Sequence, residues 1–399
     1  MAFNLQNNAT SEEIVLMNEH IQRYGNISNF NLNTASIQEK IGFYLRKINQ
    51  NSYNSSTFML RIAKIYLEMG REKDNERWLV IATINGNELA SSILTKPPKL
   101  KKLSADNLRK ICNPETYHTC NNAFVDELGS RYEKGNDGIV RNNELSKQLY
   151  QIGMERGNPH SKCKIAQFNI ENNPNYAKQL LITAMQQFPN FKWAYIIYST
   201  MLQKGLLNGG IPDYNSAMMV LEQLVRNNPG YARGKFRLAL FYSGEYHAMI
   251  EEHPHFPRES HNPNYIPINQ EKAYNYYQQT YDKIHNSALK IAQAYDPNYH
   301  GFPGFNTDFH EKNIDTAFHY YKVASDKNDG EAIYITGLFY ENVEPYANIV
   351  PVNIDKAIEL YIKGSRKKDQ RCIERLTVLG IPIPNDVLEA LTDGEDEDF

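Results

Sequence analysis

Two similar phrases near the end of the chain constrain its fold more than any other feature. Residues 315–324 read Asp-Thr-Ala-Phe-His-Tyr-Tyr-Lys-Val-Ala, and residues 355–364 read Asp-Lys-Ala-Ile-Glu-Leu-Tyr-Ile-Lys-Gly. Each phrase predicts a helix, because Asp315 and Asp355 can accept the free N–H groups of a first helical turn. A helix of this kind cannot bury its apolar face alone, so its repetition predicts a stack of repeats.

The same spacing recurs along most of the chain. One predicted helix of each unit carries a small residue followed three positions later by a bulky one: Ala63/Tyr66, Gly129/Tyr132, Ser199/Leu202, Ala239/Tyr242, Ala292/Tyr295 and Gly337/Tyr340. The other helix carries such a pair four positions apart: Ser146/Tyr150, Ala177/Leu181, Ala217/Leu221, Ala273/Tyr277, Ala317/Tyr321 and Ala357/Tyr361. Small residues in register let neighbouring helices approach closely. The pattern therefore predicts paired helices from about residue 56 to 376.

The clearest unit resembles a known family. Its first helix contains Leu128-Gly129-Ser-Arg-Tyr132-Glu-Lys-Gly135, and a loop, Tyr150 and Gly157 follow. This arrangement resembles the Sel1-like repeats, relatives of the tetratricopeptide repeats with a longer loop between the two helices. The resemblance implies an all-α, right-handed α-solenoid of antiparallel helix pairs. It also implies a protein-binding scaffold or adaptor with protein partners, in the assembly of a larger complex or in host interaction.

Breaks in the pattern predict the domain organisation. We expect an N-terminal helical cap with a degenerate repeat at 1–95, a linker at 96–122, a repeat solenoid at 123–376 with inserts at 243–269 and 296–311, and a closing segment with an acidic tail at 377–399. The amphipathic stretch 12–21 fits either a helix that caps the first repeat or a loosely docked arm. The Lys-Pro-Pro-Lys-Leu-Lys-Lys run supports the linker, since paired prolines break a helix. Its alternative role is a localisation signal or a patch for anionic lipid.

Charge and composition limit the class of function. The net charge of −3 and the pI near 6.4 argue against a general nucleic-acid binder. The first residues lack the basic and apolar regions of a signal peptide, and no apolar run reaches the length of a membrane span. Four scattered cysteines form no disulfide framework. These features predict a cytoplasmic protein; the alternative is a bacterial effector exported without a cleaved signal, with the acidic C-terminus as its address.

No residue pattern predicts an enzyme or a cofactor. The first insert gathers His247, Glu251, Glu252, His253, His255, Glu259 and His261. Prolines keep this stretch extended and no zinc spacing is present, so an ordinary polar loop is the favoured interpretation and a metal-dependent hydrolase the alternative. Cys112, His118 and Cys120 form a smaller cluster that favours incidental thiols. Phosphate-binding loops, nucleophile elbows and two-histidine metalloprotease helices are absent from the sequence.

A second stripe on the first helices is the candidate partner-binding surface. It comprises the positions five and two residues before each bulky first-helix residue, which lie beside the packing stripe. In the resembled family the first helices line the concave surface. From this stripe we predict partner-binding residues Arg61, Lys64, Glu127, Ile197, Arg237, Lys290, Gln293 and Ile335. Its mixed chemistry favours a peptide or protein partner over a nucleic acid.

Overall fold

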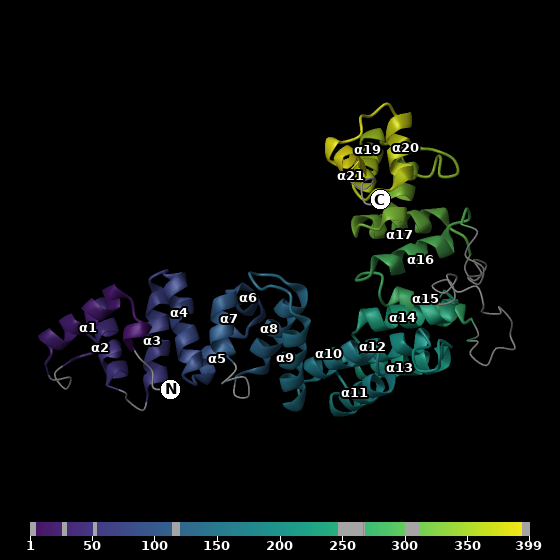
Figure 1. Cartoon of the computed structure of the whole chain (residues 1–399). Helices are drawn as coiled ribbons and strands as arrows, with labels where there is room; N and C mark the ends of the chain where they lie inside the picture. The colour runs from purple at the N-terminus through teal and green to yellow at the C-terminus, as the bar shows by residue number, and fades with distance from the viewer. Residues whose placement is uncertain are drawn as a thin grey trace. The chain divides into compact units, whose positions relative to one another are not determined.

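The computed structural model describes residues 5–25, 30–50, 54–113, 120–245, 266, 268–299 and 311–392. The chain divides into two compact units, Met1–Asn169 and Ile170–Phe399, which we call unit 1 and unit 2. Every regular element in the described residues is helical, which confirms the predicted all-α fold class. Helices that follow one another in sequence pack as neighbours within each unit (Figure 1). No described helix is both long and apolar enough to cross a membrane.

The helices of unit 1 are short and closely spaced along the chain. They are a 3-10 turn at Leu5–Asn7, then α1 (Ser11–Arg23), α2 (Ile37–Asn49), α3 (Ser55–Glu68), α4 (Glu72–Ile84), α5 (Glu88–Leu94), α6 (Pro97–Lys102), α7 (Ala105–Ile111), α8 (Asn122–Lys134), α9 (Asn143–Glu155) and α10 (Pro159–Asn169). Those of unit 2 are α11 (Pro174–Gln187), α12 (Lys192–Gln203), α13 (Tyr214–Asn227), α14 (Ala232–Ser243), α15 (Gln270–Gln278), α16 (His285–Tyr295), α17 (Ile314–Asp326), α18 (Gly330–Glu341), α19 (Ile354–Ser365), α20 (Gln370–Val378) and α21 (Asn385–Thr392). The pairs α8/α9, α12/α13, α14/α15, α16/α17 and α18/α19 are the hairpins of the repeat.

The packing positions predicted from the sequence form the core. All six small and all six bulky residues of the second-helix series are fully buried. The small first-helix residues are buried as well. A Cβ atom built on Gly337 would lie 2.4 Å from Cε1 of Tyr361, and one on Gly129 would lie 3.2 Å from Cε1 of Tyr150. The small residue of one helix therefore makes room for the ring of its partner helix.

Each second helix begins with a cap that also closes the preceding loop. The capping residues are Asn142, Asp213, Asn269, Asn313 and Asn353. The N–H of each cap donates to the carbonyl of the bulky residue near the end of the first helix, Tyr132, Leu202, Tyr242, Tyr295 or Tyr340, at 2.8–2.9 Å. Loops of very different length thus end on the same hydrogen bond. The two predicted inserts belong to this series.

These caps correct one prediction. Asp315 and Asp355 do not cap their helices, because the side chains of Asn313 and Asn353 accept the N–H groups of Thr316 and Lys356. The two aspartates lie in the first turn. There their charge favours the positive end of the helix dipole without a capping hydrogen bond.

A buried tyrosine hydroxyl joins the two helices of four hairpins. Tyr150, Tyr277, Tyr321 and Tyr361 donate to Glu133, Glu245, Asp296 and Glu341, in that order, at 2.7–3.2 Å. Each carboxylate follows the bulky residue of the first helix by one to three positions. Asp296 is wholly buried and accepts a second hydroxyl, from Tyr346, at 2.9 Å. The hydroxyls thereby satisfy carboxylate oxygens that would otherwise be costly to bury.

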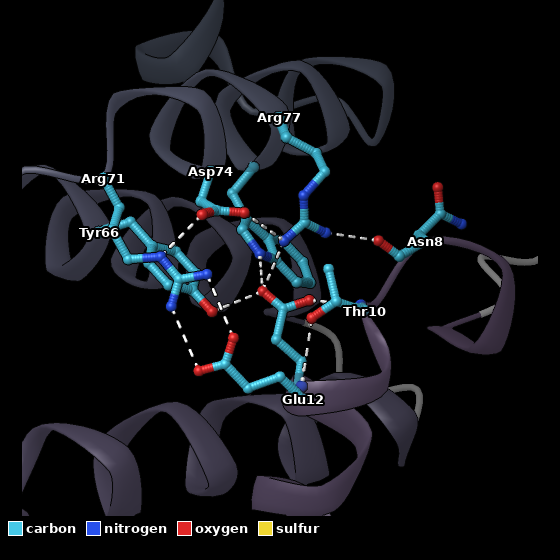
Figure 2. A network of polar contacts seen from close by, with 9 residues as sticks. Asn8, Thr10, Glu12, Tyr66, Arg71, Asp74 and Arg77 are labelled. Atoms are coloured by element: carbon cyan, nitrogen blue, oxygen red, sulfur yellow. Dashed lines mark hydrogen bonds and ion pairs between the residues drawn. The ribbon is translucent and has the colours of Figure 1, made fainter.

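The N-terminal helix α1 is fixed to α3 and α4 by one carboxylate. Glu13 is fully buried and its Oε1 accepts hydrogen bonds from Tyr66, Arg77 and Trp78 at 2.6–2.7 Å (Figure 2). Burial raises the pKa of Glu13, but the hydrogen bonds outweigh it and the pKa lies below its usual value. Arg71 also binds Glu12 and Asp74. Of the two interpretations of this stretch, the docked helix is the one the structure shows.

The described part of residues 96–122, predicted as a linker, contains helices α6 and α7. Pro97 and Pro98 stand in the first turn of α6, where a missing N–H costs no helical hydrogen bond. Leu100 and Leu103 of this segment are buried in the core of unit 1. The fully buried guanidinium of Arg131 donates to the carbonyls of Leu100, Lys101 and Leu103. The prolines therefore separate α5 from α6 without leaving this stretch in solvent. The placement of domain boundaries stays a prediction.

Candidate partner-binding stripe

In unit 1 the predicted stripe keeps two cations at the surface. Arg61 and Lys64 of α3 are exposed. The Arg61 guanidinium lies over the rings of Tyr44 and Phe58, at 5.6 and 6.0 Å from the ring centroids. Aromatic faces hold it in place without neutralising its charge. These two positions remain candidates for contact with a partner.

Glu127 of α8 is not available as the sequence predicts. Its side chain is buried and binds Nε of Arg131 at 2.9 Å and Nζ of Lys101 at 2.6 Å. Lys101 belongs to α6, which packs against α8. The sequence predicts that α6 is part of a solvated linker, but α6 packs on α8. The expectation of an exposed Glu127 was therefore wrong. Its role in unit 1 is to pair two cations.

Three more predicted residues, all in unit 2, are buried where exposure was expected. Ile197, Gln293 and Ile335 are 6%, 2% and 8% exposed. Gln293 bonds to the next first helix, and Ile335 belongs to an apolar cluster that includes Leu289 and Ala292 of α16. All three side chains are covered within the chain itself. Whether any stripe residue binds a partner stays a prediction.

Across unit 2 the stripe forms a row of polar contacts between successive first helices, which we call the polar ladder. Arg237 of α14 lies 3.4 Å from the Thr200 hydroxyl of α12. Lys290 of α16 binds Glu245, which follows α14, at 2.7 Å. Gln293 of α16 donates to Glu331 of α18 at 3.0 Å. The structure therefore brings together predicted residues Arg237, Lys290 and Gln293 with three partners, of which the sequence analysis missed Glu245 and Glu331.

The middle of the polar ladder is electrically balanced. The Lys290 and Glu245 side chains are only 14% and 12% exposed, so they form a nearly buried ion pair. Tyr299 lies close by, and burial together with the charges of Glu331 and Glu245 raises its pKa to about 12. The second amide atom of Gln293, Oε1, is buried and has no hydrogen-bond partner among the described residues. Lys290 therefore supports the fold, in contrast to its predicted role as an exposed contact.

Arg237 is different because it has no anionic partner among the described residues. It is half-buried, and its one hydrogen bond goes to the neutral hydroxyl of Thr200. Burial lowers the pKa of Arg237; Tyr231 opposes this shift, and the charge of Arg233 adds to it. Leu240, also half-buried, lies one turn further along the same face of α14. The site thus combines a partly desolvated cation with an apolar neighbour.

Comparison with known proteins agrees with this repeat geometry. Residues 127–158, 261–285, 299–329 and 331–369 match the family model of the Sel1 repeat. The chain contains Sel1 repeats. This confirms the resemblance drawn from Gly129 and Tyr132, and proteins of the Sel1 repeat family are generally scaffolds for protein interactions. No curated protein matches the chain.

Several solved structures are similar to this chain at low sequence identity. A Sel1 repeat protein from Oxalobacter formigenes is 18% identical over 69% of this chain and 95% of that chain, with a TM-score of 0.47. The protective antigen c5321 of uropathogenic Escherichia coli, which displays an SLR fold, is 14% identical over 96% of this chain and 77% of its own, also at 0.47. Human IFIT1 in a dimer with m7Gppp-AAAA is 12% identical over 90% of this chain and 96% of that chain, with a TM-score of 0.36.

Two predicted features lie outside the described residues. The first is the cluster of His247, Glu251, Glu252, His253, His255, Glu259 and His261, and the second is the acidic tail at 393–399. Within the residues that the structure describes, no group of three or more His, Cys, Asp or Glu side chains could hold a metal ion. The metal-dependent hydrolase and the export address remain alternatives drawn from the sequence alone.

Proposed function

We propose that this Sel1-repeat protein is a scaffold that binds a segment of a protein partner on the stripe of unit 2. The bound segment places a carboxylate, from an Asp or Glu side chain or a C-terminus, on Arg237. The observation that carries the proposal is the half-buried guanidinium without an anionic partner among the described residues. Elsewhere on the stripe, Glu127 and Lys290 already have partners of opposite charge.

The physical argument rests on the cost of an unpaired charge. Removing a cation from water is unfavourable unless an opposite charge and hydrogen bonds compensate for the lost hydration. Burial of the Arg237 charge therefore carries a free-energy cost, in line with its lowered pKa. A carboxylate on the planar guanidinium can accept two parallel N–H bonds, which are stronger than bonds between neutral groups. The site is therefore complementary to an acidic ligand before that ligand arrives.

The test begins with the partner itself. Full-length protein is used to capture binding proteins from its native cell, mass spectrometry identifies them, and the dissociation constant is measured for the purified pair. Arg237→Ala should weaken binding by roughly 30-fold or more, since removing one member of a desolvated charge pair costs about 2–5 kcal/mol. The affinity of Arg237→Lys should lie between those of the natural chain and Arg237→Ala, because a lysine keeps the charge but cannot bind a carboxylate through two parallel bonds.

A matched control separates binding from folding. Arg233 lies on the same helix and is exposed, so Arg233→Ala should change affinity by no more than about fivefold. Arg237→Leu should leave the melting temperature unchanged or higher, because it removes an unpaired charge, and yet abolish tight binding. Unchanged affinity in Arg237→Ala would overturn the proposal. So would a partner that proves to be a nucleic acid and no protein.

A further inference from the structure

Two cysteines in unit 1 face each other at the junction between α7 and α8. Sγ of Cys112, which follows α7, lies 3.2 Å from Sγ of Cys120, which precedes α8. Neither cysteine belongs to a disulfide in this structure. A disulfide bond is about 2.0 Å long, so a shift of roughly 1 Å would join them. The sequence alone favours incidental thiols here, because a separation of eight positions does not show that the two side chains meet in the fold.

The two thiols differ in accessibility and in electrostatics. Cys112 is 1% exposed, whereas Cys120 is partly exposed. The Cys112 thiol, hydrogen-bonded to Cys120, holds the pKa of Cys120 below its usual value, and the nearby Arg156 guanidinium lowers it further. The pKa of Cys112 is raised by the same hydrogen bond and by burial. Cys120 therefore has the character of an attacking thiolate, and Cys112 that of a protected partner.

We infer that Cys112 and Cys120 form a reversible disulfide by exchange with a small-molecule disulfide of the glutathione type. The Cys120 thiolate attacks one sulfur of that molecule, forms a mixed disulfide and releases one thiolate. Cys112 then gives up its proton and attacks the Cys120 sulfur, which releases the second small thiol. Two protein thiols are oxidised, one small disulfide is reduced to two thiols, and the protein protons pass to the two released thiolates.

The bond would link the end of α7, a short helix of unit 1, to the start of α8. Helix α7 contacts both α4 and α8. The first stretch that matches the Sel1 repeat starts at residue 127, within α8. Oxidation would fix the end of α7 to the start of α8 and slow amide hydrogen exchange in α7, because local opening there would require chain rearrangement around a closed loop.

The experiment equilibrates the full-length protein in buffers of graded reduced and oxidised glutathione. Free thiols are then trapped with N-ethylmaleimide and the digest is analysed by mass spectrometry. We expect peptides with Cys112 and Cys120 to be joined in oxidising buffer and alkylated in reducing buffer, with one midpoint potential. Cys163 and Cys372 are buried, and burial raises the pKa of each to about 12, so they should remain thiols throughout. Independent titration of Cys112 and Cys120, or no crosslink at any ratio, would overturn the inference.

Variants test the order of attack. Cys112→Ser should stop at the mixed disulfide on Cys120, while Cys120→Ser should leave Cys112 unmodified. Cys163→Ser is the matched control and should oxidise as the natural chain does. Arg156→Gln should slow the first step about threefold for each unit by which the thiol pKa rises, because lower thiolate content is partly offset by higher nucleophilicity. Arg156→Lys should restore the rate. Mixed disulfide on Cys112 in the Cys120→Ser variant would contradict the assigned roles.

Discussion

The contact between Gly337 and Tyr361 permits a quantitative test of the repeat packing. In Gly337→Ala the new methyl group would lie 2.4 Å from Cε1 and 2.9 Å from Cζ of Tyr361. Carbon atoms in contact normally lie about 3.5–4.0 Å apart, so the ring must move by roughly 1 Å. The ring is fully buried, and its hydroxyl donates to Glu341 at 2.7 Å. A shift of this size loses both good packing and that hydrogen bond.

The opposing contributions can be compared. Overpacking costs about 1–3 kcal/mol, and a hydrogen bond to a charged acceptor contributes about 1.5–3 kcal/mol. Replacing glycine by alanine inside a helix stabilises it by about 1 kcal/mol. We therefore expect Gly337→Ala to lower the free energy of unfolding by about 2–4 kcal/mol. Gly129→Ala is the matched control, because its methyl group would meet Tyr150 at 3.2 Å and needs only a small adjustment. Its net change should lie within about 1 kcal/mol of zero.

The assay is urea unfolding of the full chain, read by circular dichroism and by hydrogen exchange in α18 and α19, because a repeat protein need not unfold in one step. Tyr361→Leu should relieve the clash, since leucine occupies the same position at Leu181 and Leu221. Gly337→Ala should then cost less in the Tyr361→Leu background than alone. Equal stability of Gly337→Ala and Gly129→Ala would contradict the close contact between Gly337 of α18 and Tyr361 of α19.

Three further predictions concern stability and are checked by the same unfolding measurements. Glu13→Ala should cost about 3–5 kcal/mol, because it leaves Arg77 without its buried acceptor. The pKa of Glu13 in the folded protein lies below its usual 4.5, so ionised Glu13 stabilises the fold above pH 4.5. This stabilisation is lost as the pH falls through the lower folded pKa. A loss of stability centred above pH 4.5 would contradict the assignment. Asn353→Ala should cost about 1 kcal/mol as a lost cap, and Asp355→Ala less; the reverse order would favour Asp355 as the cap. Lys290→Ala should destabilise by about 2–4 kcal/mol because it leaves the nearly buried charge of Glu245 without a cation, and an unchanged stability would contradict a structural role for Lys290.

The sequence predicts the packing of the repeat well and its surface poorly. A small residue opposite a bulky one, as at Ala317 and Tyr321, has few solutions other than a close helix contact, so local spacing is sufficient. Exposure of Gln293 depends on how near the next first helix lies, and exposure of Glu127 depends on the packing of α6, and spacing within one helix carries no such information. The cap is a finer case. Asn353 and Asp355 are both good capping residues two positions apart, and only the backbone geometry distinguishes them.

The carboxylates that receive tyrosine hydroxyls could have been found from the sequence. Tyr132-Glu133, Tyr295-Asp296 and Tyr340-Glu341 repeat an acidic residue directly after the bulky position. A recurring charge beside a core position signals a buried hydrogen bond, because a charge there is costly without one. By contrast, Lys101 reaches Glu127 only because α6 packs on α8, and no local pattern indicates that contact.

The capping hydrogen bond at the base of each loop makes this chain a natural platform for protein engineering. The segment between Tyr242 and Asn269 and the much shorter one between Tyr132 and Asn142 both end on the same N–H to carbonyl contact. Doubling the length of a loop costs only about 0.6 kcal/mol of closure entropy. An epitope, an enzyme recognition tag or a small binding peptide could therefore be grafted between Tyr340 and Asn353 while the two flanking helices keep their register.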